Sequence, residues 1–204
     1  MANACFTTIS VAPKIPGEAE RVGLMLEKWL KERFSENLVS PSLLGNFALH
    51  AGFNPDDFDL RGEVVDIYHN DSFVYIIALD SWSPKIVFWF AVFNRFLGVD
   101  QFSFVYTADE VSSGVFKTND AGLLKTYYWD NFGEDPQVAA LIGDDYFSVT
   151  AEETRGFLLR LLPEADPNAA VKDLLSVFKD SRLSECCAIY EWQESNENLQ
   201  EVNL

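Results

Sequence analysis

The chain has 204 residues, and its 32 acidic side chains outnumber its 15 basic ones, which gives a formal net charge of −17. Phosphate repels such a chain, so nucleic-acid binding through a basic face is disfavoured and a basic partner is favoured. Hydrophobic residues make up 48% of the sequence, with 17 Phe, 7 Tyr and 5 Trp. Disordered acidic chains are poor in aromatic residues, so this composition predicts a folded protein that displays its charge on its surface.

The cysteines and the apolar runs indicate the compartment. Cys5, Cys186 and Cys187 are odd in number and have no Cys-x-x-Cys spacing, which is typical of buried or half-buried free thiols in a reducing compartment. The longest apolar run, Ile86 to Phe93, has eight residues, whereas roughly 20 are needed to cross a bilayer. The opening residues lack the basic flank and apolar run of a signal peptide. We therefore expect a cytoplasmic protein with no membrane contact.

Strand and helix patterns alternate in the first half of the chain. Cys5 to Val11 is rich in β-branched and aromatic residues and predicts a strand, and apolar residues at helical spacing predict a helix at Glu18 to Phe34. We expect a short strand near Leu44 to His50, followed by a polar loop at Asn54 to Arg61. Two more strands are predicted at Glu63 to Tyr68 and Phe73 to Leu79.

A helix predicted from Pro84 to Leu97 is apolar on nearly every side. Ser83 suits its N-cap, Pro84 its first turn and Gly98 its end. Such a helix on its own would expose much apolar area to water, so we expect it to lie between two layers or at an interface. The C-terminal helices are expected to cover it; self-association through this helix is the alternative.

The second half of the chain begins with a strand and ends with helices. Alternation predicts a strand at Gln101 to Tyr106, and Val115 to Lys117 with Leu123 to Trp129 predicts a hairpin or meander. Thr150 and Glu153 have the spacing of a capping box at the start of a helix. The remaining predicted elements are a short strand at Tyr146 to Val149, a helix at Asp166 to Lys179 and a strand at Glu185 to Trp192.

This order of elements predicts an α+β fold. Two successive β-α-β pieces are typical of a ferredoxin-like split βαβ sheet with helices on one face. We expect residues 1–130 to form this ferredoxin-like core. Residues 131–204 are expected to be a C-terminal helical and strand extension that packs on the core, within one domain overall.

Several short motifs in the first 122 residues form a recognisable set. Ser81-Trp82-Ser83-Pro84 leads into a helix, the following strand contains Phe104-Val105-Tyr106, and Glu110 and Gly114 come soon after. This arrangement resembles the YubB-type ferredoxin-like domain family of plasmid and phage proteins, and Asn3-Ala4-Cys5 is similar to that family's opening Asn-Trp-Cys. The family's tryptophan-rich middle motif has no match here. The resemblance implies a ferredoxin-like fold and an origin on a mobile element, and it implies no catalytic residues.

Small clusters of acidic residues recur along the chain, and three interpretations compete. They form a solvated surface, they imitate nucleic-acid phosphates and occupy a basic groove on another protein, or they bind metal. Asp56-Asp57-Phe58-Asp59 lacks the glycine and final glutamate of a calcium loop, which disfavours the third.

The sequence contains no motif for catalysis. Phosphate-binding glycine loops, dinucleotide fingerprints and the Gly-x-Ser-x-Gly elbow are absent. His50 and His69 are the only histidines, which excludes a multi-histidine zinc centre. We therefore expect no enzymatic activity, no cofactor and no bound metal. Trp82, at a strand-to-helix corner, is either packed over the sheet edge or an exposed aromatic anchor for a partner.

The leading hypothesis is a non-enzymatic acidic binding protein of a phage or mobile element. It engages a basic, nucleic-acid-handling host protein without binding nucleic acid directly, as a nucleic-acid mimic that inhibits a CRISPR-type defence complex. The residues expected to bind the partner are Asp56, Asp57, Asp59, Asp109, Glu110, Asp144, Asp145 and Trp82. One alternative is a metal-dependent hydrolase that uses Asp80, Asp109 and Glu110. The other is a structural protein that forms a homo-oligomer through the Pro84–Leu97 helix.

Overall fold

The computed structural model describes residues 4–81, 83–110, 114–133, 135–142, 147–194 and 199. The chain divides into an N-terminal unit, Met1–Asp120 with Ser195–Leu204, and a C-terminal unit, Ala121–Glu194. Residues 121–130, which the sequence pattern assigned to the core, belong to the C-terminal unit. Both units combine helices with β-sheet, so the expected mixture of α and β structure is confirmed.

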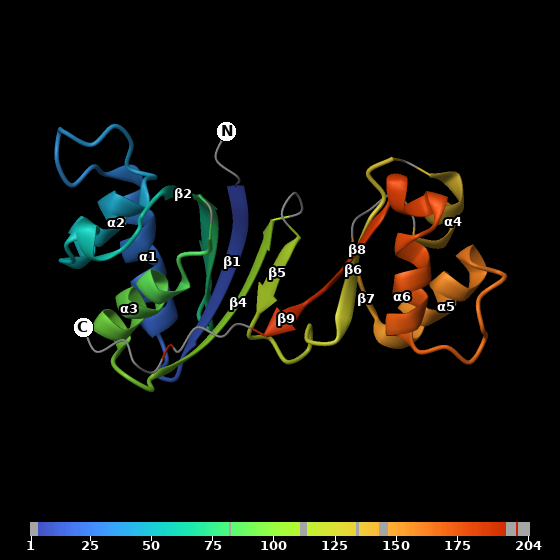
Figure 1. The fold of residues 1–204 in the computed structure, drawn as a ribbon. Coiled ribbons are helices and arrows are strands. Elements are labelled where there is room, and N and C mark those ends of the chain that lie inside the picture. Colours follow the sequence, from blue (N-terminus) through green and yellow to red (C-terminus); the bar gives the residue numbers. More distant parts are fainter. Residues whose placement is uncertain are drawn as a thin grey trace. The chain divides into compact units, whose positions relative to one another are not determined.

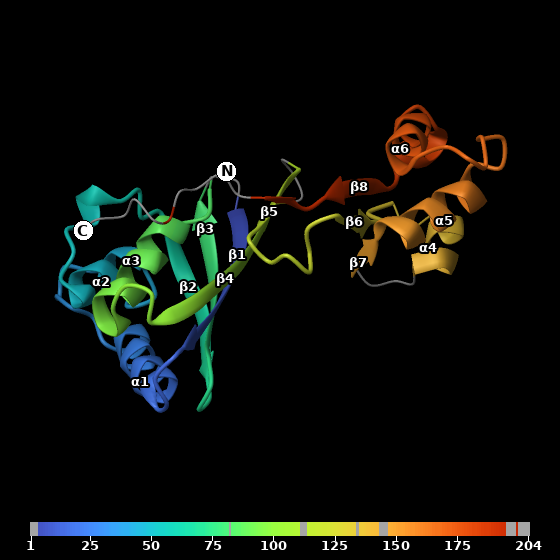
Figure 2. The ribbon, with the colours of Figure 1, turned by 90° about the horizontal axis from the view of Figure 1, so that it is seen from below.

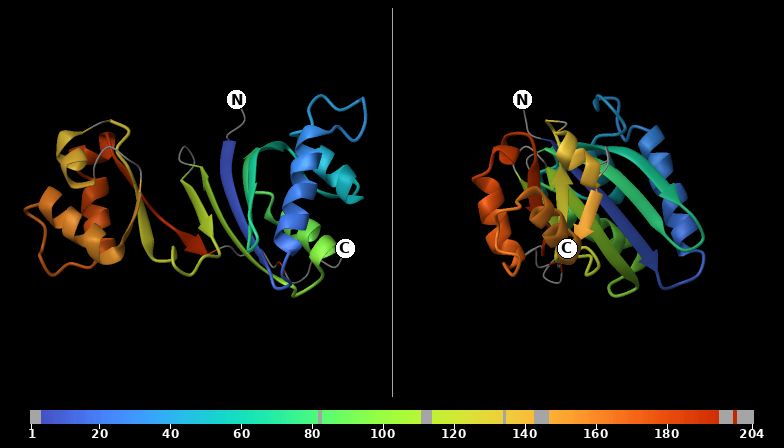
Figure 3. Two further views of the ribbon diagram at one scale, coloured as in Figure 1. Left: turned by 180° about the vertical axis from the view of Figure 1, so that it is seen from behind. Right: turned by 90° about the vertical axis from the view of Figure 1, so that its right-hand side faces the viewer.

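The N-terminal unit has a sheet whose strands lie in the order β2-β3-β1-β4-β5, and neighbouring strands in this order are antiparallel. The helices α1, α2 and α3 lie on one face of this sheet (Figures 1 and 2), as the view from behind also shows (Figure 3). The elements in chain order are β1 (Ala4–Pro13), α1 (Glu18–Lys31), α2 (Leu44–Ala51), the 3-10 helix η1 (Pro55–Asp57), β2 (Gly62–His69), β3 (Val74–Ser81), α3 (Ile86–Leu97), β4 (Phe102–Glu110) and β5 (Val115–Thr118).

The register of the strands decides which side chains face the helices. Ile9 of β1 pairs with Ile76 of β3 and Tyr106 of β4, and all three are buried. The next residue, Ser10, pairs with Tyr75 and belongs to the other face, because side chains alternate along a strand. One face of the sheet therefore builds the core with α1, α2 and α3, and the opposite face, which we call the open face, carries no helix of this unit.

The apolar helix α3 packs against the neighbouring helix α2 and against the sheet. On one side, Trp89 contacts Phe47 of α2, with ring centroids 5.6 Å apart. On the other side, Phe90 contacts Phe102 of β4 at 5.6 Å. Within the N-terminal unit, α2 and the sheet cover the aromatic side chains of α3.

The segment Leu44–Ala51 is the helix α2, so the prediction of a short strand there is wrong. Its buried apolar side chains recur at helical spacing, at Leu44, Phe47, Ala48 and Ala51. Asn46 is also buried, and its Nδ2 donates to the main-chain oxygens of Trp29, Glu32 and Pro41. These bonds hold α2 against the end of α1. A local sequence pattern does not reveal hydrogen-bond partners that are distant in the sequence.

The helix α3 begins at Ile86, after the predicted start at Pro84, and Ser83 does not cap it. Instead, Asp80 at the end of β3 accepts a hydrogen bond from the main-chain nitrogen of Lys85, 3.0 Å from Oδ2. A carboxylate near the first turn also interacts favourably with the helix dipole. The capping group is thus supplied by the sheet and not by the residue next to the helix.

The C-terminal unit packs helices on a three-stranded sheet of order β7-β6-β8, antiparallel throughout. Trp129 of β6 is fully buried, and its ring centroid lies 5.9 Å from that of Phe157 and 6.1 Å from that of Phe178. The elements are β6 (Thr126–Asp130), α4 (Pro136–Ile142), β7 (Phe147–Thr150), α5 (Ala151–Leu161), α6 (Val171–Lys179), the 3-10 helix η3 (Arg182–Glu185), β8 (Ala188–Glu191) and β9 (Gln193–Glu194).

The predicted hairpin or meander formed by residues 115–117 and 123–129 is wrong. β5 pairs with β4, whereas β6 pairs with β7 and β8. The helix predicted from Asp166 begins only at Val171, and the last predicted strand is preceded by η3. The capping box is confirmed: Thr150 Oγ1 accepts from the nitrogen of Glu153 at 3.2 Å, and Glu153 Oε2 accepts from the nitrogen of Thr150 at 2.9 Å.

Candidate functional site

The loop that carries Asp56, Asp57 and Asp59 is held in place by aromatic packing. Asn54 accepts a hydrogen bond from the nitrogen of Asp56 and so begins η1. Phe58 packs against the core, with its ring 5.4 Å from that of Phe88 in α3. Since Phe58 points inward, its acidic neighbours are left on the exposed side of the loop.

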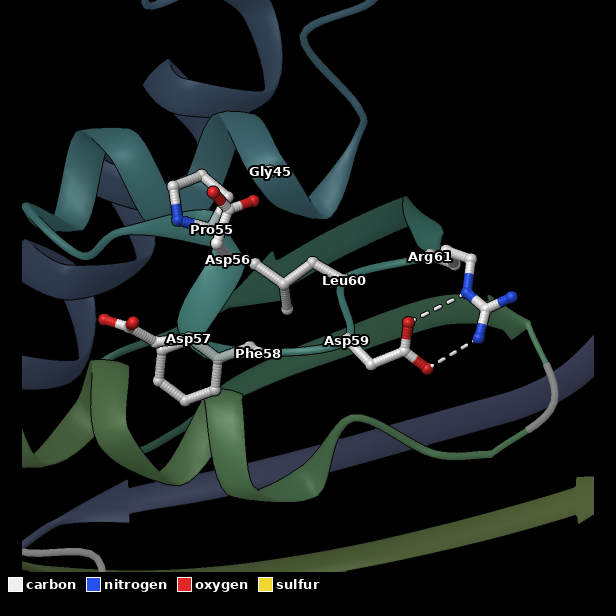
Figure 4. A pocket seen from close by; sticks show the side chains of 8 residues that line it. All are labelled: Gly45, Pro55, Asp56, Asp57, Phe58, Asp59, Leu60 and Arg61. Carbon is white, nitrogen blue, oxygen red and sulfur yellow. Dashed lines mark hydrogen bonds and ion pairs between the residues drawn. The ribbon is translucent and has the colours of Figure 1, made fainter.

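Two pockets flank this loop. One, of about 530 Å³, is lined by Gly45 and residues 55–61 (Figure 4). The other, of about 280 Å³, lies between the loop and the first turn of α3. In Figure 4 the carboxylates of Asp57 and Asp59 point in opposite directions. The loop therefore does not converge its acids on a single ion, in keeping with the sequence-based argument against a calcium loop.

Asp59 is compensated within the chain, whereas its two neighbours are not. Arg61 donates to both carboxylate oxygens of Asp59 at 2.8 and 2.9 Å, and Lys85 Nζ lies 3.3 Å away. The hydrogen bonds from Arg61 and then Lys85 lower the pKa of Asp59 to about 2. Asp56 and Asp57 are exposed and have no ion pair with any described residue. They are the acids of this loop that remain for a partner.

Asp80, near the end of β3, is fully buried. Its Oδ2 accepts from Thr7 Oγ1 at 2.8 Å and from the nitrogen of Lys85 at 3.0 Å, while its Oδ1 has no hydrogen-bond partner among the described residues. Burial raises the pKa of Asp80 to about 6. Gly62 leaves room beside it: a Cβ there would lie 2.7 Å from the oxygen of Leu79 and 3.0 Å from Asp80 Oδ1. Asp80 is therefore a structural cap without access to solvent.

The residues Asp109 and Glu110 fall on opposite faces of the N-terminal sheet. Asp109 pairs with Phe6 and lies on the open face, where burial raises its pKa to about 6. Glu110 follows it on the helix-facing side and is buried. Asp80 pairs with Cys5, the neighbour of Phe6, and so it also faces the helices. The trio of Asp80, Asp109 and Glu110 therefore does not meet at one point.

No group of three metal-ligating side chains exists in the part of the chain that the structure describes. Burial raises the pKa of the Cys5 and Cys187 thiols to about 12, so neither forms a thiolate nucleophile near neutral pH. All three cysteines are free and buried or half-buried, as expected. Trp82, Asp144 and Asp145 lie outside the described residues.

The C-terminal unit carries a second set of acids, which belong to the clusters that recur along the sequence. Residues 121–194 contain 14 acidic and six basic side chains. No ion pair joins two described residues of this unit. Arg155 donates to the main-chain oxygens of Ala169 and Pro167 and neutralises no carboxylate. Exposed acids stand on α5, on α6 and between them, at Glu152, Glu153, Glu164, Asp166 and Asp173.

Comparisons with protein-family models, with curated proteins and with solved structures find no match to this chain. Within the described residues, none of the helices has the length and apolar character required to span a bilayer. A functional proposal for this chain therefore rests on the geometry and the charge of its own described residues.

Proposed function

We propose that the chain is a non-enzymatic acidic binding protein of a phage or mobile element that engages a basic, nucleic-acid-handling protein in the host cytoplasm. The observation that carries this proposal is the uncompensated negative charge on exposed, well-folded surfaces. Asp56 and Asp57 have no ion pair with any described residue, and the C-terminal unit displays exposed carboxylates without any internal ion pair among its described side chains. Such groups attract cationic side chains and act as substitutes for phosphates.

The partner class follows from the sign of the charge. A protein that handles nucleic acid has a groove lined with Lys and Arg, and a net charge of −17 steers this chain toward it over long range. A CRISPR-type defence complex is one such partner, and the resemblance to the YubB-type family supports an origin on a mobile element. Binding of this kind weakens as salt screens the charges.

We also propose that the N-terminal unit is a ferredoxin-like fold. Support comes from the strand order β2-β3-β1-β4, in which β3 lies between β1 and β2 and is antiparallel to both. The connections β1-α1-α2-β2 and β3-α3-β4 are then two interleaved split βαβ pieces with their helices on one face. The helix α2 is an addition to that pattern.

The experiment that tests the function is a pull-down from host lysate with the purified full chain at about 50 and about 500 mM NaCl. We expect a nucleic-acid-binding protein to be retained at low salt and lost at high salt. Asp56→Lys with Asp57→Lys should weaken capture strongly. Glu18→Lys with Glu32→Lys is the matched control, because it changes the net charge equally at acids that already pair with Arg21 and Lys28. Equal capture by both variants and wild type would contradict the proposal.

The other two hypotheses find no support in the geometry. A hydrolase built on Asp80, Asp109 and Glu110 would need these carboxylates together, and the strand register separates them. Self-association through the Pro84–Leu97 helix would need an exposed apolar face, and that helix uses its aromatic side chains within the N-terminal unit.

A further inference from the structure

The open face of the N-terminal sheet carries a row of aromatic and apolar side chains. Tyr68 of β2 pairs with Tyr75 of β3, Tyr75 pairs with Ser10 of β1, and Ser10 pairs with Val105 of β4. Residues paired in an antiparallel sheet share a face, so these four lie in one line across the open face. Phe6 lies on the same face, since it is an even number of positions along β1 from Ser10.

Several of these side chains are exposed to solvent. Tyr68 is 53% exposed, Phe6 41% and Val105 36%. The rings of Tyr68 and Tyr75 lie next to each other, with centroids 6.4 Å apart. A tyrosine ring supplies a rigid surface on which a planar guanidinium stacks.

The charges on the open face all have one sign. Asp66 pairs with Ile77 beside Tyr68, and Asp109 pairs with Phe6. None of the described residues on this face of β1 to β5 is Lys or Arg. These strands contain one such residue, Lys117, and it pairs with Ala108 and so lies on the helix-facing side. Asp109 has no hydrogen bond or ion pair with any described residue, and burial already raises its pKa. Its ionised form is therefore poorly solvated and would be stabilised by a cation.

We propose that the open face, at Phe6, Asp66, Tyr68, Tyr75, Val105 and Asp109, docks an arginine-rich segment of a basic partner protein. Guanidinium groups stack on the tyrosine rings and pair with the two carboxylates. This inference rests on the proposed function and adds a further surface, in addition to Asp56 and Asp57, together with its chemistry of recognition. The negative charge of the open face disfavours three other occupants. A second copy of the chain has a net charge of −17, and the C-terminal residues 121–194 have 14 acids against six bases. Nucleic acid is disfavoured because its phosphates are negative.

The test uses the full-length chain and a nona-arginine peptide. Titration of the isotopically labelled protein, followed by NMR, should shift the amide signals of β1 to β4 on the open face more than those of α5 and α6. Asp66→Asn with Tyr68→Ser should weaken binding about tenfold, since it removes one carboxylate and one stacking ring. Asp173→Asn with Val177→Ser is the matched control on exposed α6 residues and should change the affinity less than twofold. Asp109→Asn should weaken binding in the same direction if the double variant fails to fold.

The outcomes separate this inference from the proposed function. If nona-arginine binds but both double variants weaken it equally, or the shifts concentrate on α5 and α6, the open face is not the docking site and the proposed function stands. If wild type does not bind the peptide even at low salt, the proposed function fails as well. Dimerisation that Val105→Asp abolishes, or binding of an oligo-thymidine probe that needs Tyr68, would replace the basic segment with another occupant and overturn the inference.

Discussion

Asp59 and Asp80 contact the same lysine residue but have opposite electrostatic environments. Asp59 is exposed and receives hydrogen bonds from Arg61 and from Lys85 Nζ, so its pKa falls to about 2. Asp80 is buried under the helices, so its pKa rises to about 6 although Thr7 and the Lys85 nitrogen donate to it. The sequence-based hypotheses assigned Asp59 to an acidic partner-binding surface and Asp80 to an alternative hydrolase site. The difference arises from the strand register, which turns Asp80 toward the core with Ile76 and Ala78.

Asp80 makes the stability of the N-terminal unit depend on pH. Folding raises its pKa from 3.8 to about 6, so between those values the folded chain holds a proton that the unfolded chain has lost. The free energy of unfolding therefore falls by an amount on the order of 3 kcal/mol as pH rises through this window. Asp80→Asn keeps an acceptor and should remove this part of the slope, measured by urea unfolding from pH 4 to pH 8.

Two controls accompany this prediction. Asp80→Ala removes both hydrogen bonds as well as the titrating group, so its stability should lie about 2 kcal/mol below that of Asp80→Asn at every pH. Asp109 contributes a slope of the same sign because its pKa is also raised, so the comparison rests on the difference between the Asp80→Asn and wild-type curves. If those two curves run parallel, Asp80 does not titrate as proposed.

The elements of the fold were predictable where a local signal was strong. The strand β3 and the helix α3 follow from apolar runs bounded by turn residues, and the start of α5 follows from its capping box. The helix α2 was missed because its stability comes from Asn46 and from packing against Trp29 and Trp89, which are distant in sequence. The partners of β5 and β6 were missed because pairing depends on the division into two units.

The capping box at Thr150 gives a prediction for α5. Thr150→Ala removes the acceptor for the Glu153 nitrogen and should destabilise the helix by about 1 kcal/mol. Hydrogen exchange in α5 should become about fivefold faster, as measured by mass spectrometry on peptides from this helix. Thr150→Ser retains the hydroxyl and should leave exchange nearly unchanged. Equal acceleration in both variants would show that the methyl group, and not the cap, is what stabilises the helix.

For the whole molecule, the net charge of −17 is distributed over both units. In the N-terminal unit several acids pair with neighbouring bases, as Glu18 does with Arg21 and Asp59 does with Arg61. In the C-terminal unit the described acids have no such ion pairs. Mutual repulsion among these carboxylates opposes the compact state, because unfolding moves the charges apart.

Added salt should therefore stabilise the folded chain. We expect the melting temperature to rise by several degrees between about 20 and about 300 mM NaCl, since the Debye length falls from roughly 20 Å to below 8 Å. Asp56→Asn with Asp57→Asn should melt higher than wild type at low salt and gain less from added salt. Differential scanning calorimetry measures both effects. A melting temperature that falls as salt is added would show that attractive ion pairs dominate.

The sequence by itself determined the mixed helix and sheet content, most of the element positions and the excess of negative charge, because periodicity and composition are properties of the chain alone. Only the tertiary structure decided which acids are exposed and uncompensated, as at Asp56, and which are paired or buried, as at Asp59 and Asp80. It also created the open face around Tyr68 and Tyr75. The physical reason is that exposure depends on strand register and on which face the helices cover, and both are set by contacts between residues far apart in the sequence.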